Sequence, residues 1–88
     1  MDENSLQVGA IYFGVGYEDD ESLSRPILST FEYLGEEERR PSTHIFKYLG
    51  TGDLLELKDS QLDYVLDFEG LKEVLGDWYQ RIQVNRSE

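Results

Sequence analysis

The chain has 88 residues, of which 19 are acidic and 8 basic, giving a formal net charge of −11. This length predicts one small domain over residues 1–88, with 1–6 and 84–88 frayed and a core built largely from six tyrosines, four phenylalanines and one tryptophan. Because the chain has no cysteine, disulfides, thiolate metal sites and thiol catalysis are excluded.

The sequence shows no sign of export or membrane insertion. Its first residues, "MDENSLQ", lack the basic and apolar regions of a secretory signal. No run approaches the roughly 18 apolar residues that span a bilayer. A chain without disulfides is compatible with the cytosol, so we expect a cytoplasmic protein that does not enter a membrane.

The first strand is expected from Val8 to Tyr17, where side chains alternate with a period of two. One face would carry Ile11, Phe13, Val15 and Tyr17, and the other Ala10, Tyr12, Gly14 and Gly16. Glycines within a strand indicate a bulge or the close approach of another group. The residues that follow, "EDDESLSRP" (18–26), are expected to form a charged loop.

Three more strands are expected over "ILSTFEYLG" (27–35), opened by Pro26, "THIFKYLG" (43–50) and "DLLELK" (53–58). The polar stretch 35–42 and the turn "GTGD" separate them. The segments "FEYLG" and "FKYLG" match at four of five positions. Two adjacent antiparallel strands that meet similar packing demands would explain this echo.

The stretch "QLDYVLDF" (61–68) fits two structures. Alternation of apolar residues over 62–68 favours a fifth strand. The helical spacing of Leu62, Val65 and Leu66, with Ser60 as N-cap in a capping box with Asp63, favours a short helix. We favour the helix.

A longer helix is predicted over 68–82, with Asp67 as its N-cap. Its apolar stripe consists of Phe68, Leu71, Leu75, Trp78 and Ile82, widened by Val74 and Tyr79. Strands followed by a helix predict an α+β fold, an antiparallel meander of about four strands with the C-terminal helix packed on one face and burying the Trp78 stripe. The alternative is a small SH3-like barrel capped by the helix.

Acidic residues are concentrated in two blocks. Residues 1–38 hold ten acids and one base, residues 39–52 three bases and no acid, and residues 53–77 eight acids and two bases. Such a surface repels phosphate backbones and anionic lipids and attracts basic proteins. We therefore expect a non-catalytic protein-binding domain, in the sharpest form an inhibitor that docks a basic surface. Its expected contact residues are Glu18, Asp19, Asp20, Glu21, Glu36, Glu37, Glu38, Asp59, Asp63 and Asp67.

The sequence is also compatible with three other binding functions. Carboxylates copying the spacing of nucleic-acid phosphates would make the chain a mimic of nucleic acid. A homo-oligomer or accessory subunit would expose apolar side chains, with Tyr12, Tyr48, Trp78 and Tyr79 at the interface. The acidic loop 18–22 has suitable oxygen ligands for calcium but lacks the spacing of an EF-hand.

Catalysis, cofactor binding and direct nucleic-acid binding are not expected. His44 is the only histidine, and no serine lies in a nucleophile elbow. Glu32 and Glu56 would form a carboxylate pair only if their strands brought them face to face. The aromatic residues Tyr12, Tyr33, Phe46 and Tyr48 would serve as stacking platforms, but only Arg39, Arg40 and Lys47 offer positive charge.

Overall fold

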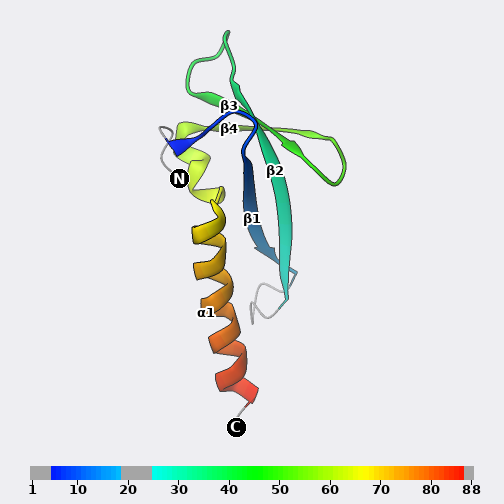
Figure 1. The fold of residues 1–88 in the computed structure, drawn as a ribbon, viewed down its shortest axis with the longest axis vertical. Coiled ribbons are helices and arrows are strands. Elements are labelled where there is room, and N and C mark those ends of the chain that lie inside the picture. Colours follow the sequence, from blue (N-terminus) through cyan, green and yellow to red (C-terminus); the bar gives the residue numbers. More distant parts are fainter. Residues whose placement is uncertain (1–4, 19–24, 87–88) are drawn as a thin grey trace.

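The computed structural model describes residues 5–18 and 25–86 (Figure 1). Its elements are β1 (Ile11–Tyr17), β2 (Pro26–Glu36), β3 (Thr43–Tyr48), β4 (Leu54–Lys58), the 3₁₀ helix η2 (Asp59–Tyr64) and the helix α1 (Phe68–Arg86). In this part of the chain no helix is both long and apolar enough to cross a bilayer.

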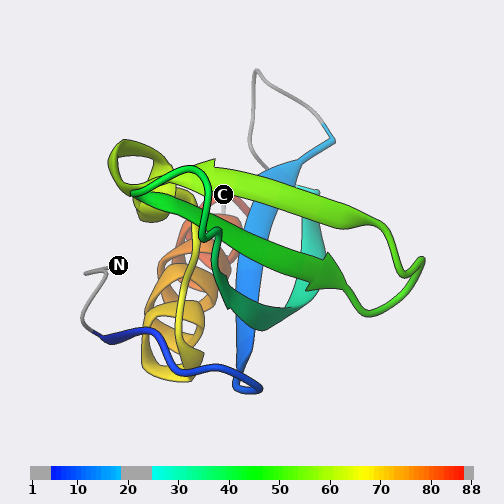
Figure 2. The same ribbon diagram turned by 90° about the horizontal axis from the view of Figure 1, so that it is seen from above.

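The four strands form an antiparallel sheet in the order β1-β2-β3-β4, so the predicted α+β meander followed by a helix is confirmed. Seen from above, β3 and β4 cross steeply over β1 and β2 (Figure 2). Over the described residues the sheet stays open, so the SH3-like barrel is not the fold observed. A bulge between Tyr33 and Gly35 interrupts the β2–β3 register, and Gly35 adopts a φ of 126° there, which favours glycine.

Aromatic residues of β2 and β3 form the centre of the core. In the antiparallel register Phe31 lies opposite Tyr48, and Tyr33 lies opposite Phe46. Each phenylalanine of the repeated segments therefore faces the tyrosine of the other, as two similar adjacent strands require. Phe31 and Phe46 are fully buried, with ring centroids 6.1 Å apart.

The core lies on the face of β1 that carries Tyr12 and Gly14. A Cβ on Gly14 would stand 3.1 Å from ring atoms of both Phe31 and Tyr64, so this glycine makes room for two aromatic rings. A Cβ on Gly16 would have no neighbour within 4 Å. The close approach that a strand glycine indicates is thus present at the first position and missing at the second.

Residues 59–66 combine the two structures expected for them. Asp59–Tyr64 is helical, but it begins two residues earlier than expected: Lys58, not Ser60, is the N-cap, and its N–H donates to Gln61 Oε1 at 3.0 Å. Leu66 then pairs with Phe13 on the free edge of β1 through two backbone hydrogen bonds of 2.7 and 2.8 Å. Of the alternative fifth strand, only this single β-bridge is present.

Helix α1 runs alongside β1 and begins at its expected cap, because the N–H of Gly70 donates to Asp67 Oδ1 at 2.7 Å (Figure 1). It extends to Arg86, four residues beyond the expected end. The rings of Phe13 and Phe68 are 6.3 Å apart where helix and strand meet. The molecule is consequently elongated, measuring 54 × 24 × 20 Å.

The apolar stripe of α1 is buried less than expected. Only Leu71 is buried, Trp78 is half-buried, and Phe68 and Tyr79 are 59% and 57% exposed. The reason is that Leu62 and Val65, each 1% exposed, already cover the aromatic face of the sheet. At the other terminus, residues 1–4 lie outside the described part, whereas Leu6, expected to be frayed, packs against the core.

Candidate protein-binding surface

The acidic residues at the end of β1 are only partly described. Glu18 is exposed, and its carboxylate lies 3.9 Å from Arg25. Asp19, Asp20 and Glu21, and with them most of the candidate calcium loop, lie outside the described residues. Among the residues that are described, no group of three or more His, Asp or Glu side chains is placed to hold a metal ion.

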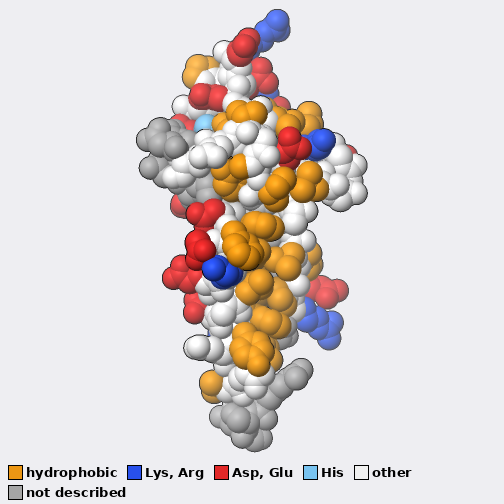
Figure 3. All heavy atoms as spheres, viewed as in Figure 1, with side chains coloured by type: hydrophobic (Ala, Val, Ile, Leu, Met, Phe, Trp, Pro, Cys, Tyr) orange, Lys and Arg blue, Asp and Glu red, His pale blue; other side chains and the backbone are white. Residues whose placement is uncertain are grey.

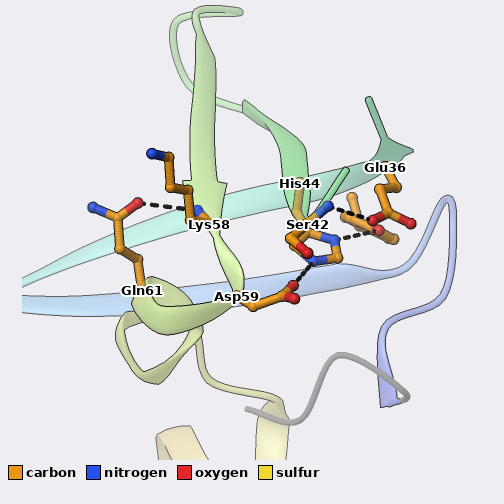
Figure 4. Close-up of polar contacts among 7 residues, drawn as sticks. Glu36, Ser42, His44, Lys58, Asp59 and Gln61 are labelled. Atoms are coloured by element: carbon orange, nitrogen blue, oxygen red, sulfur yellow. Dashed lines mark hydrogen bonds and ion pairs between the residues drawn. The ribbon is translucent and has the colours of Figure 1, made fainter. Parts of the chain in front are cut away.

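The acids of the β2–β3 connection serve local structure. Glu36 Oε1 accepts a hydrogen bond of 2.8 Å from the N–H of Ser42 (Figure 4), whose φ of 64° lies in the left-handed region. The carboxylate therefore stabilises an unfavourable turn conformation. Glu37 lies 4.0 Å from Arg40, and Glu38 is exposed.

Arg40 also forms the shortest surface ion pair among the described residues, 2.6 Å to Glu56. This hydrogen bond lowers the pKa of Glu56 and raises the pKa of Arg40. Glu32 lies opposite Lys47, and Glu56 lies opposite Ile45, so β3 stands between the two carboxylates considered as a pair. The register does not bring them face to face.

His44 belongs to a hydrogen-bonded chain that was not anticipated. Its Nδ1 lies 2.8 Å from the hydroxyl of Tyr33, and its Nε2 lies 2.6 Å from Oδ1 of Asp59 (Figure 4). The side chain of His44 is 5% exposed. Burial raises the pKa of Tyr33, and the nearby carboxylates of Glu36 and Asp59 raise it further.

A neutral imidazole satisfies every member of this chain: Nε2–H donates to Asp59, and Nδ1 accepts from the hydroxyl of Tyr33. Both ring nitrogens of His44 are then occupied, which leaves neither to take a proton from a substrate. Asp59, expected at a contact surface, thus also holds η2 to β3. The alternation of His44 with Phe46 was the available signal that this side chain faces the core.

Within the described residues, a line of exposed carboxylates runs along α1. Glu69, Glu73 and Asp77, which we call the acidic row, recur every four residues and are all exposed. They share one side of the helix and rise about 6 Å from one to the next. The expected contact residues ended at Asp67, whose carboxylate caps this helix. The four-residue spacing that reveals the row is readable in the sequence.

Apolar side chains are exposed next to these carboxylates. Figure 3 shows hydrophobic side chains gathered along the line where α1 meets the β1–β2 hairpin, with acidic side chains beside them. An open groove of about 800 Å³ lies between Tyr17 of the hairpin and the C-terminal half of α1. Its helical lining is Val74, Asp77, Gln80, Arg81 and Val84, so the last carboxylate of the acidic row reaches the groove.

The residues expected at an oligomer interface are not equally available. Tyr12 is buried in the core, where its ring packs edge-on against Phe46. Tyr48 and Trp78 are half-buried, and Tyr79 is exposed. Of the four, Trp78 and Tyr79 belong to α1, and neither is among the residues that line the groove.

Comparison of the chain with protein-family models, with curated proteins and with solved structures finds no match.

Proposed function

We propose that this chain is a non-catalytic, cytoplasmic domain that binds a protein with a basic surface through the acidic row of α1. The observation that carries the proposal is the row itself: Glu69, Glu73 and Asp77 are exposed on one side of α1, and Asp77 borders an open groove that Tyr17, Val74 and Val84 line together with Gln80 and Arg81. A partner segment that combines lysine or arginine with an apolar side chain fits this arrangement.

Electrostatics favours the N-terminal half of α1 over the other acidic segments. Its three carboxylates are about 6 Å apart, within the Debye length of about 8 Å at physiological salt, so they act together on an approaching charge. Lys72, which lies 3.0 Å from Glu69, is the one base in this half. The β2–β3 connection, in contrast, places Arg39 and Arg40 directly beside Glu37 and Glu38.

The charge density of the row favours a protein partner reached through a basic patch over mimicry of nucleic acid. A DNA duplex carries one charge per about 1.7 Å of helix axis, whereas the row carries one per about 6 Å. The ion pair of Lys72 with Glu69 lowers that density further. The row therefore offers far fewer charges than a duplex of the same length.

A pair of charge-matched variants tests the proposal. The acidic-row variant E69Q/E73Q/D77Q and the control E37Q/E38Q/D53Q each lose three negative charges, so unspecific attraction falls equally in both. We expect the wild-type chain to capture basic proteins from a cell lysate and to release them as salt rises. The acidic-row variant should fail to capture these proteins, whereas the control should still capture them. Equal capture by the two variants, or capture that high salt leaves unchanged, would contradict the proposal.

A further inference from the structure

We propose that the side chain of Gln61 closes the open edge of β4 and thereby keeps two copies of this chain from joining their sheets. Among the described strands, β4 has a neighbour on one side only. At the opposite edge of the sheet, β1 is already engaged by its bridge to Leu66. This inference does not rest on the proposed function, because no residue of the acidic row takes part in it.

The hydrogen bonds between β3 and β4 show which backbone groups reach the open edge. The N–H of Asp59 donates to the carbonyl of Ser42 at 3.0 Å, so these two residues form a hydrogen-bonded pair across the ladder. Because backbone groups alternate in direction along an antiparallel strand, the N–H and C=O groups of Leu54, Glu56 and Lys58 point away from β3. Such an edge is a template on which another chain pairs.

Gln61 occupies one of these three outward positions. From the first turn of η2, its Oε1 accepts the N–H of Lys58 at 3.0 Å (Figure 4). The carbonyl of an added strand would need the same N–H. Gln61 and Lys58 are both exposed, so the side-chain amide, and not burial, keeps this N–H from an added strand.

The register that Gln61 blocks is the one in which two copies of β4 match best. Two antiparallel copies related by a two-fold axis pair through their outward residues, so few registers exist. One register sets Glu56 of each copy opposite Lys58 of the other, with Leu57 facing Leu57 at the axis. Sliding one strand by two residues sets Glu56 opposite Glu56, which is destabilising, and two more set Leu54 opposite Glu56 without an ion pair. Gln61 thus withholds one N–H per copy from the charge-matched register.

Replacing Gln61 by Ala tests the inference. Sedimentation equilibrium at physiological salt compares it with the wild-type chain, because a Debye length of about 8 Å screens distant repulsion and leaves contact pairs. We expect the dimer dissociation constant to fall at least about tenfold, since two further hydrogen bonds form per dimer. Ser60→Ala, at the exposed neighbour in η2, should leave it unchanged. Circular dichroism checks the fold, and equal association of all three chains would overturn the inference.

A second substitution in the Gln61→Ala background tests the register. Adding Lys58→Glu sets Glu56 opposite another carboxylate and is expected to abolish the gained association. Adding Lys72→Glu, which changes net charge equally on α1, should weaken it less. The same loss in both double variants would contradict pairing through β4.

Hydrogen exchange locates the contact. In Gln61→Ala at low concentration, the N–H of Lys58 should exchange faster than in the wild-type chain, because its acceptor is gone. At high concentration the N–H groups of Lys58 and Glu56 should become protected together. Association without protection of these two groups would show that the copies meet elsewhere and would overturn the inference.

Discussion

Nε2 of His44 lies 2.6 Å from Oδ1 of Asp59, which joins the middle of the sheet to the helix that covers its aromatic face. The hydroxyl of Tyr33 holds the other side of the ring at 2.8 Å. Three elements, β2, β3 and η2, are therefore fixed to one another by one buried imidazole. The contact gives an acidic residue of the surface a role in stability.

Replacing Asp59 by Ala removes the acceptor of a buried N–H. We expect the free energy of unfolding to fall by about 1–3 kcal/mol, the cost of leaving a buried donor without a partner. Urea denaturation followed by circular dichroism measures the change. Glu38→Ala, at an exposed carboxylate, is the matched control and should change stability by less than about 0.5 kcal/mol. Equal effects of the two substitutions would show that the His44–Asp59 contact is not stabilising.

The burial of Tyr33 predicts a loss of stability at alkaline pH. Because its pKa is raised above the ordinary value of 10.0, the folded state holds the phenolic proton more tightly than the unfolded chain does. This contribution is complete below pH 10.0 and is lost as pH rises through the higher pKa of the folded state. Tyr33→Phe should make the fall of the urea midpoint above pH 10.0 shallower. An unchanged pH dependence would count against this source of stability.

The two glycines of β1 should respond in opposite ways to alanine. In Gly14→Ala the new methyl group would stand 3.1 Å from Phe31 and from Tyr64, and we expect a destabilisation of about 1–3 kcal/mol from overpacking. In Gly16→Ala the methyl group has no neighbour within 4 Å, and we expect no loss of stability. Thermal unfolding of the two variants measures the difference. A Gly16→Ala variant as unstable as Gly14→Ala would contradict the close packing inferred around Gly14.

The strands and helices were predictable from the sequence wherever the apolar periodicity and the turn or capping residues indicated the same boundaries. The echo of "FEYLG" and "FKYLG" even indicated a pair of adjacent strands, and the register bears this out by setting Phe31 opposite Tyr48. What could not be predicted is which apolar groups meet. Leu62 and Val65 take the core face of the sheet, which leaves the stripe of α1 only partly covered. Both the 3₁₀ helix and α1 carry apolar side chains that could cover the core face of the sheet. Which of them does so depends on the path of the chain and cannot be read from the apolar pattern.

The acidic character of the candidate surface was predictable from the sequence, but the residues that form it were not. Counting charges identified an acidic chain, but the selected segments included Glu36 and Asp59, whose hydrogen bonds depend on long-range register. The predicted contact residues did not include Glu69, Glu73 and Asp77, because these acids are separated in sequence and become neighbours only on a helix. Applying the four-residue period to charges as well as to apolar residues would have found them.

The most direct test of the proposed function is the salt dependence of binding to a captured basic partner. If the acidic row is the contact, the logarithm of Kd should rise steeply with the logarithm of salt concentration for the wild-type chain and for E37Q/E38Q/D53Q. For E69Q/E73Q/D77Q the line should be shallower and Kd at least about tenfold weaker at low salt, a loss of about 1.4 kcal/mol. Coinciding lines for the two charge-matched variants would contradict the account.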